Sequence, residues 1–381
     1  MSLKERVLDG IKERRTNVLE GKFNCIPSPF IRFRTDFPGV EHACYYTITS
    51  ATKMGKSQFT SYTFIYNSLF FAYEHKDKIR VKIFMFPLEE TPERIFQRFI
   101  SHLLFVKYKV RIAPKDLRST LTAVPEEILE YISREEFQDM LDFFEESVIF
   151  FDTANPTGVY KACRDYAEQH GTTYTRPFKK KDEFGNERTY QAFDYYIPDD
   201  KDEYRIVILD TINLIETERG LTVKQSIDKM SEYFTKELRN KYGFTIVVIQ
   251  QQSVESENND AVKLNRVRPS IANLGDSKYC SRDSEITLGL FSPAKFGMEM
   301  YLGYDIRKFK DNIRFLEVIT NRNGEMGGII ALFFDGATCS FSELPPPNDT
   351  AALEKVYKYL DDMRGIRKTK TFLMKLFRRN G

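Results

Sequence analysis

Gly55, Lys56 and Ser57 have the residue types and the spacing of a loop that binds phosphate groups. They follow the apolar run 45–49 and precede a segment, 58–75, whose composition is typical of a helix. In such a loop glycine lets the backbone approach the phosphates, lysine reaches the β- and γ-phosphates, and the serine hydroxyl binds Mg²⁺. The alternative is a loop that merely ends a core strand. We predict an ATP-binding loop made of Ala51, Thr52, Lys53, Met54, Gly55, Lys56, Ser57 and Gln58.

Hydrolysis of ATP also requires a carboxylate that supports Mg²⁺ and a base that polarises the attacking water. We expect both at the carboxyl ends of apolar strands, because ligands of open α/β sheets bind there. Asp210 ends the apolar run 205–209, so we predict that Ser57 and Asp210 hold the metal. Glu89 and Glu90 both follow another apolar run, and the spacing alone does not choose the base between them.

A polar amide at the end of a strand can sense the γ-phosphate and transmit its loss to the next loop. Gln251 follows the apolar run 245–249 and is our candidate for this role. Its neighbours Gln250 and Gln252 leave the register open by one residue.

Short apolar runs alternate with helical stretches along most of the chain, which predicts a mostly parallel sheet covered by helices on both faces. Two later runs flank the turn Arg322-Asn323-Gly324, and Asn-Gly is a strong hairpin signal. We therefore expect an α/β fold whose sheet finishes with antiparallel strands. The predicted strands are 45–49, 81–86, 148–151, 205–209, 245–249, 285–290, 315–320, 329–334 and 339–341.

The composition excludes several classes of protein. With 381 residues the chain has room for one large α/β domain with appendages, or for two ordinary domains. Its net charge of +2 is nearly neutral, so any surface for nucleic acid must be local. The longest apolar runs are strand-sized, so we predict no contact with a membrane. Five cysteines without metal-ligand spacing and four scattered histidines favour a reducing cytoplasm over a disulfide framework or a zinc site.

Three segments stand apart from the alternating pattern. Residues 1–22 read as a helix whose apolar stripe needs a partner surface, with packing on its own domain as the alternative. Residues 172–202 interrupt the ATPase domain, 23–344, with a polar, aromatic and basic hairpin, which is either a solvated excursion or a contact for DNA or a partner. Residues 345–381 form a proline linker and a basic helical tail that binds nucleic acid or docks as a helix.

Several motifs in order carry a resemblance to a known family. Ile26-Pro27-Ser28-Pro29-Phe30 is similar to the motif Pro-Thr-Gly-Phe, and Pro87-Leu88-Glu89-Glu90 is similar to Ser-Leu-Glu-Met. Residues 51–57 are similar to the loop Ala-Arg-Pro-Ser-Met-Gly-Lys-Thr, which also lacks the first glycine of the usual pattern, here replaced by Ser50. These motifs belong to the DnaB-type replicative DNA helicases. The resemblance covers residues 26–341, implies a RecA-like P-loop NTPase fold, and selects Glu89 as the base.

Two further segments extend this resemblance. Residues 268–277 resemble the segment Arg-Pro-x-x-x-Asp-Leu-Arg-Glu-Ser, which in the family faces a central channel and holds single-stranded DNA. Residues 320–324 resemble Lys-Gln-Arg-Asn-Gly, whose arginine completes the neighbouring subunit's active site, so Arg322 is the implied catalytic finger. The resemblance implies DNA contacts at Arg268, Gly275, Asp276, Lys278 and Arg282.

The chain also departs from the family pattern. Gly275 replaces the arginine of the channel loop, and Thr320 replaces the lysine that accompanies the finger. Only residues 1–25 precede the first motif, so we expect no counterpart of the family's N-terminal helical domain. Residues 1–22 resemble instead the linker helix that docks on an adjacent subunit.

The resemblance implies an ATP-dependent replicative DNA helicase that uses ATP and Mg²⁺ and moves along single-stranded DNA as a ring, with a homohexamer as the expected assembly. Its implied setting is the cytoplasm of a bacterial or phage-infected cell, with a primase or a helicase loader as further partners. Two alternatives stay open: a RecA-like recombinase or filament ATPase, and an ATP-binding replication scaffold with little turnover.

Overall fold

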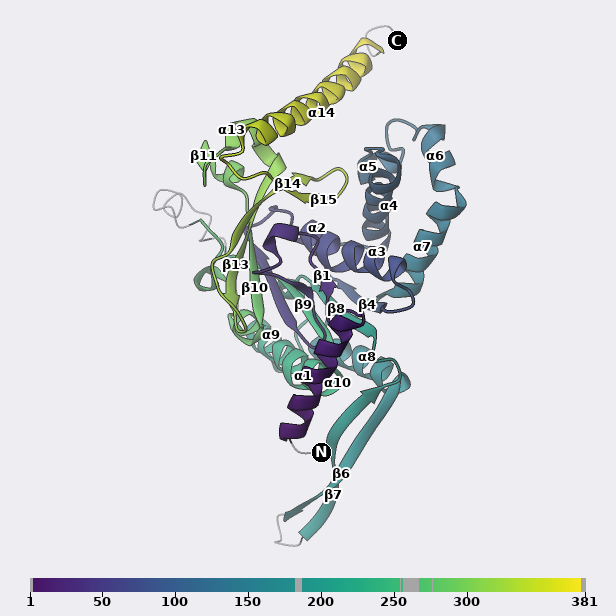
Figure 1. The fold of residues 1–381 in the computed structure, drawn as a ribbon, viewed down its shortest axis with the longest axis vertical. Helices are drawn as coiled ribbons and strands as arrows, with labels where there is room; N and C mark the ends of the chain where they lie inside the picture. The colour runs from purple at the N-terminus through teal and green to yellow at the C-terminus, as the bar shows by residue number, and fades with distance from the viewer. Residues whose placement is uncertain (1–2, 182–186, 254, 256–266, 276, 378–381) are drawn as a thin grey trace.

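A computed structural model describes residues 3–181, 187–253, 255, 267–275 and 277–377. Within these residues one sheet contains nine strands, in the order β15-β14-β13-β10-β3-β9-β8-β4-β5 (Figure 1). The six strands from β10 to β5 are parallel to one another, and β13 pairs antiparallel with β10, β14 with β13, and β15 with β14. The predicted α/β architecture with an antiparallel finish is therefore confirmed.

Most residues of the parallel strands are buried, on both faces of the sheet, which explains why their sequences are continuous apolar runs. They are β3 (Tyr45–Ser50), β4 (Arg80–Pro87), β5 (Val148–Phe150), β8 (Glu203–Asp210), β9 (Thr245–Gln251) and β10 (Ile286–Phe291). The antiparallel strands are β13 (Ile313–Asn321), β14 (Ile329–Asp335) and β15 (Ser340–Glu343). The turn predicted at residues 322–324 lies between β13 and β14.

Helices cover both faces of the sheet. One face carries α2 (Lys56–Thr60), the π-helical segment η2 (Ser61–Tyr66), α3 (Asn67–Glu74), α4 (Pro92–Tyr108) and α7 (Glu135–Ser147). The other carries α8 (Pro156–Gln169), α9 (Val223–Glu232), the π-helical segment η4 (Tyr233–Arg239) and α10 (Asn240–Tyr242). Along β8, Ile206 and Ile208 pack toward α2, whereas Val207 and Leu209 pack toward α9. This alternation decides where the polar side chains at the strand ends point.

Short elements complete the part of the chain that the structure describes. They are β1 (Ile26–Pro27), β2 (Gly39–Val40), α5 (Pro114–Leu117), α6 (Glu126–Ile132), α12 (Tyr279–Asp283), β11 (Met300–Tyr301), β12 (Tyr304–Asp305) and α13 (Ile306–Phe309), with 3₁₀ turns between several of them. No helix among these described residues combines the length and the apolar character that crossing a bilayer requires.

The two terminal helices differ in how they use their apolar residues. Helix α1 (Leu3–Leu19) leaves Val7, Ile11 and Val18 exposed, so its stripe has no cover within the described part of this chain. Helix α14 (Thr350–Phe377) instead buries Leu353 and Leu360 in a cluster beside β13 and α13. The first half of the tail is thus a docked helix.

An antiparallel pair of strands, β6 (Gly171–Lys181) and β7 (Glu187–Pro198), projects from the body of the molecule (Figure 1). At its base the Tyr196 hydroxyl donates a hydrogen bond to the Ala167 carbonyl oxygen, and the ring of Phe193 packs edge-on against Tyr242. These contacts attach the arm to helices α8 and α10.

His102 provides a pH-dependent test of the packing between α4 and the β14–β15 turn. Burial lowers the pKa of His102 to about 4, and its Nδ1 lies 3.0 Å from the Thr338 carbonyl oxygen. Between about pH 6.5 and pH 4 the unfolded chain binds a proton here that the folded chain does not, so stability falls as the pH is lowered. We expect the free energy of unfolding to lose up to about 1.4 kcal/mol per pH unit in this window through His102.

Urea unfolding at several pH values between 4.5 and 7 measures this slope. His102→Gln should flatten the slope, whereas His170→Gln, at an exposed position, should keep it. Equal slopes in the wild type and in His102→Gln would contradict this assignment.

Candidate active site

The predicted phosphate-binding loop connects β3 to α2. Gly55 has φ 92°, a left-handed conformation that glycine adopts without strain, and it directly precedes α2. The Lys56 ammonium crosses the loop and donates hydrogen bonds to the carbonyl oxygens of Ser50, at 3.3 Å, and Ala51, at 3.1 Å. The backbone thus surrounds a buried cation, which is the arrangement that a phosphate-binding loop requires.

A buried arginine supports this loop from the antiparallel part of the sheet. Arg314, on β13, donates from Nε to the Met54 carbonyl oxygen at 2.8 Å. Its guanidinium also bonds the Asp311 carboxylate at 2.8 Å and lies over the ring of Phe334. That ring would lie 3.4 Å from a Cβ atom placed on Gly55, so it limits what can replace the glycine. Arg314 carries no signal in the sequence, because it reads as an ordinary strand residue.

Asp210 lies at the end of β8 beside Ser57, as a metal site requires. Its side chain faces the same side of the sheet as Ile206 and Ile208 and is buried. Burial raises the pKa of Asp210 to about 6, a hydrogen bond from Ser57 works in the opposite direction, and the charge of Glu89 adds to the increase. Asp210 Oδ1 is buried without a hydrogen-bond partner among the described residues. A hydroxyl and an unsatisfied carboxylate oxygen fit a hard cation such as Mg²⁺.

No group of three or more His, Cys, Asp or Glu residues in the described part of the chain could hold a metal ion.

Glu89 and Glu90 differ in their surroundings. Glu90 is ion-paired with Arg98, whose side chain is largely buried. Glu89 is exposed, follows the end of β4, and lies close enough to Asp210 for its charge to affect that carboxylate. The Leu88 amide donates to the Asp210 carbonyl oxygen at 2.8 Å, which fixes the two strand ends together. Of the two glutamates, Glu89 is the one whose carboxylate is not held in an ion pair among the described residues.

The three glutamines at the end of β9 point in alternate directions. Val247 and Ile249 pack on the α2 face of the sheet, so Gln251 follows them to the face that carries Ser57 and Asp210. The backbone N–H of Gln251 donates a hydrogen bond of 2.9 Å to Oδ1 of Asn213, which lies just after β8.

Gln250 and Gln252 point to the other face and hold the segment 267–277. Gln250 Nε2 donates to the carbonyl oxygens of Gly275 and Ser277, at 2.9 and 2.5 Å. Gln252 Nε2 donates to Thr49 Oγ1 at 2.7 Å, and its backbone forms a bridge with Leu274. The end of β9 therefore contacts both the nucleotide face and the segment expected to bind DNA.

The expected DNA-binding residues lie in different surroundings. Lys278 and Arg282 are exposed, and the Arg282 guanidinium lies 3.8 Å from the ring centre of Tyr279. Arg268 is exposed but ion-paired with Glu317 at 2.8 Å. Gly275 is half-buried, and its amide donates to the Gln251 carbonyl oxygen. Asp276 lies outside the described residues.

Arg322 lies near the amino-terminal ends of the parallel strands, whereas the phosphate-binding loop lies at their carboxyl ends. Asn321 pairs with Ile286, and Ile286 pairs with Tyr46, at the start of β3. The loop begins only after Ser50, at the other end of that strand, about 13 Å further along it. Arg322 is exposed and donates to the Arg282 carbonyl oxygen. The structure does not bring Arg322 together with the other predicted catalytic residues of its own chain.

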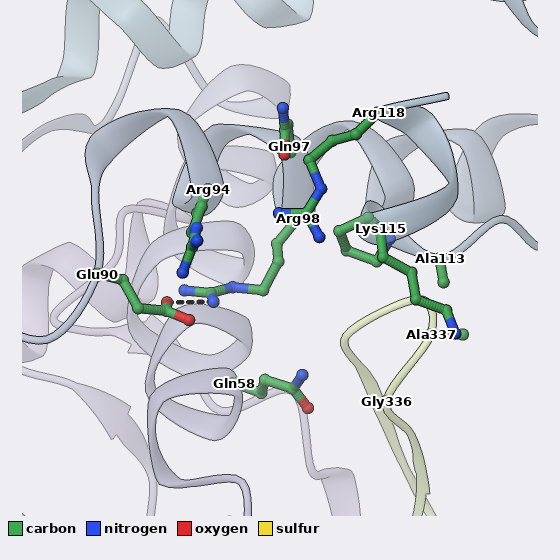
Figure 2. A pocket seen from close by; sticks show the side chains of 11 residues that line it. Gln58, Glu90, Arg94, Gln97, Arg98, Ala113, Lys115, Arg118, Gly336 and Ala337 are labelled. Atoms are coloured by element: carbon green, nitrogen blue, oxygen red, sulfur yellow. Dashed lines mark hydrogen bonds and ion pairs between the residues drawn. The ribbon is translucent and has the colours of Figure 1, made fainter. Parts of the chain in front are cut away.

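A cavity of about 480 Å³ opens next to the phosphate-binding loop (Figure 2). Gln58, which follows Ser57, lines it together with the Glu90–Arg98 pair, and Gly336 lies at its far side. Cationic and amide side chains dominate the remaining lining: Arg94, Gln97, Lys115 and Arg118. Gln58 Oε1 and Arg98 Nε are buried without hydrogen-bond partners among the described residues. This cavity has no signature in the sequence, because its lining comes from separate segments and forms no motif.

Comparison with solved structures identifies the class of fold. A DnaB-like replicative helicase, described with its interactions with primase, superposes with a TM-score of 0.60 and 14% sequence identity, covering 91% of this chain and 67% of the helicase chain. A second solved structure, of an isolated ATPase domain, superposes with the same TM-score and identity, covering 90% of this chain and 99% of that domain. No protein-family model matches the chain, and no curated protein sequence does either.

The chain therefore has the RecA-like fold of P-loop ATPase domains, and within that class it resembles the ATPase domains of DnaB-type helicases. The predicted fold class is confirmed. The roles of the individual residues stay predictions.

Glu89 and Glu90 offer a matched test of the catalytic base. We expect Glu89→Gln to lower the ATP turnover number by about 10²- to 10⁴-fold, because the attacking water loses its proton acceptor. Glu90→Gln removes a carboxylate that is already paired with Arg98, so the loss should be far smaller. Phosphate release measures turnover, and binding of a fluorescent ATP analogue shows that both variants retain the nucleotide site. A Glu90→Gln protein as inactive as Glu89→Gln would reverse the assignment.

Proposed function

We propose that this protein is an ATP-dependent DNA helicase that assembles as a ring, in which each nucleotide lies between two subunits. The observation that carries the proposal is the position of Arg322. It lies at the opposite end of the strands from its own phosphate-binding loop. As a catalytic finger it can therefore complete only the site of a neighbouring subunit. A homohexamer is the assembly that the family resemblance favours.

On the nucleotide side of each interface, the residues have separate roles. Lys56 binds the β- and γ-phosphates, and Ser57 and Asp210 hold Mg²⁺, which neutralises charge on the phosphates when bound. Glu89 accepts the proton of the attacking water, and Gln251 contacts the γ-phosphate. On the opposite side, Arg322 of the next subunit stabilises the charge of the transition state.

The cavity beside Gln58 receives the nucleoside end of ATP. Three features support this assignment: it adjoins the phosphate-binding loop, its volume of about 480 Å³ lies in the range of small-molecule sites, and amide groups line it. Gln58 and Gln97 would supply hydrogen bonds to the base or the ribose, and Arg94 a flat cationic surface.

Single-stranded DNA binds along the segment 267–283, where Lys278 and Arg282 are exposed. The bonds from Gln250 to Gly275 and Ser277 support a link between ATP hydrolysis and the position of this segment. A change at Gln251 on the nucleotide face would move the end of β9, and the same strand end holds the DNA-binding segment.

Assembly and partners complete the proposal. The exposed apolar stripe of α1, with Val7, Ile11 and Val18, supports docking of this helix on an adjacent subunit. A primase or a helicase loader is a further partner, by analogy with the similar helicase that was described with its interactions with primase. We place the protein in the cytoplasm of a bacterial or phage-infected cell.

Mixed assemblies test whether Arg322 acts on a neighbouring subunit. Arg322→Ala and Glu89→Ala should each lose ATP turnover when pure, and Arg322→Ala should lose about 10³- to 10⁵-fold. A mixture of the two should regain part of the turnover, because some interfaces combine an intact Glu89 with an intact Arg322. DNA-stimulated phosphate release and separation of a forked duplex, compared with the wild type and Lys56→Ala, measure the outcome.

The matched control mixes Lys56→Ala with Glu89→Ala subunits. Both changes damage the same side of the interface, so no interface is restored and turnover should stay low. Absence of rescue in the first mixture, with mixed rings demonstrated by electron microscopy, would contradict a site shared between subunits. A wild type that hydrolyses ATP and never separates the duplex would contradict helicase activity, and open helical assemblies would favour a recombinase-like filament.

A further inference from the structure

The projecting arm formed by β6 and β7 has two chemically different faces. Residues directly opposite each other in an antiparallel pair share a face, and every second residue returns to it. On one face, aromatic rows alternate with basic rows. From the base outward these rows are Tyr174 with Tyr195, Arg176 with Ala192, Phe178 with Tyr190, and Lys180 with Arg188. We call this set the aromatic-basic face of the arm.

The opposite face differs in composition and in surroundings. Its rows beyond the base are Thr175 with Phe193, Pro177 with Gln191, and Lys179 with Thr189. At the base, Phe193 packs against Tyr242 of α10, so this face is turned toward the body. Lys179 is ion-paired with Glu187 at 3.4 Å. The aromatic-basic face is therefore not explained by packing on the domain.

The aromatic rings on the aromatic-basic face are open to solvent. Phe178 is 51% exposed and Tyr190 is 47% exposed. Exposing two opposed rings to water adds little to the stability of an isolated pair of strands. Tyr174 and Tyr195 stack with ring centres 4.5 Å apart. Successive rows lie about 7 Å apart, because each strand rises by about 3.3 Å per residue. Rings and cations thus alternate at regular spacing along the arm.

Charge identifies the kind of ligand that this face fits. The basic rows contain Arg176, Lys180 and Arg188, and among the described residues of this face the acid is Asp194, in the bulge of β7. Arg188 has a partner of its own, so the cations considered for a ligand are Arg176 and Lys180. Asp194 lies 3.9 Å from Arg176, and both side chains are substantially exposed, so it neutralises little of the charge. A surplus of cations favours a polyanion, and exposed flat rings favour one whose bases are free to stack. Duplex DNA offers phosphates but no open base faces.

We propose that the aromatic-basic face binds single-stranded DNA, with bases stacking on Phe178 and Tyr190 and phosphates contacting Arg176 and Lys180. Strand β6 has 11 residues and extends about 35 Å, so this surface is remote from the phosphate-binding loop. It is a second DNA contact, separate from the segment 267–283. The inference rests on the proposed function only for the identity of the nucleic acid, and the binding itself requires neither ATP nor a ring.

Neighbouring lysines on opposite faces give a matched test in the full chain. Fluorescence anisotropy of labelled oligo(dT), without nucleotide and at several salt concentrations, measures the affinity. Phe178→Ala with Tyr190→Ala should weaken binding by roughly 5- to 150-fold for each ring that stacks a base. Lys180→Gln should make the negative slope of log affinity against log salt shallower by about 0.7, as expected for one lost phosphate contact on a single strand. Lys179→Gln removes the same charge from the other face and should leave the slope unchanged.

A conservative pair, Phe178→Tyr with Tyr190→Phe, should retain binding, which separates the loss of the rings from a folding defect. Equal affinity of the alanine pair and the wild type, or equal effects of the two lysine changes, would overturn the proposal. Tighter binding of duplex than of oligo(dT) through this face would overturn it too. So would arm variants that lose self-association and keep their affinity for DNA.

The two proposals can fail separately. ATP turnover without DNA should be the same in the arm variants as in the wild type. If the wild type hydrolyses no ATP while Lys180→Gln and Lys179→Gln still differ in DNA binding, the proposed function fails and the arm inference stands.

Discussion

The arrangement of the site depends on β9 being buried between β3 and β8. A strand fixed on both sides must send successive side chains to opposite faces, and a slip by one residue would exchange them all. Gln251 consequently shares a face with Asp210, whereas Gln250 and Gln252 hold the segment 267–277 on the other. A displacement of the end of β9 caused at Gln251 therefore also moves Gln250 and Gln252 on the other face. In the proposed function, this constraint converts the loss of the γ-phosphate into movement of the DNA-binding segment.

The proposed nucleotide site is built from buried polar groups that the rest of the fold keeps in place. Arg314 is almost fully buried and donates its hydrogen bonds to Met54, Asp311 and Ser292, so it is satisfied without a ligand. Asp210 is different, because one of its carboxylate oxygens has no partner among the described residues. Leaving a buried carboxylate unsatisfied is costly, and a bound cation would remove that cost. The fold thus supports the loop and leaves this oxygen of Asp210 available to the metal of the proposed function.

Sequence reasoning recovered the sheet because its signals are local. Buried parallel strands such as 205–209 are apolar runs, and the candidate site residues Asp210, Gln251 and Glu89 each follow such a run within three residues. The resemblance to a family favours Glu89 over Glu90 as the base, and the ion pair of Glu90 with Arg98 agrees with this prediction. Features assembled from distant segments could not be predicted: the support of the loop by Arg314, the pairing of Arg268 with Glu317, and the cavity beside Gln58. Each depends on which strand is the spatial neighbour, and no local pattern encodes that.

The most direct test of the account is the stimulation of ATP turnover by single-stranded DNA in Gln250→Leu compared with Gln251→Leu. Replacing Gln251 should abolish turnover with or without DNA, because the γ-phosphate loses its contact. Replacing Gln250 should leave turnover without DNA largely intact and should remove its stimulation by DNA, because the bonds to Gly275 and Ser277 are lost. Stimulation of Gln250→Leu to the level of the wild type would contradict the central claim that β9 connects the nucleotide to the DNA-binding segment.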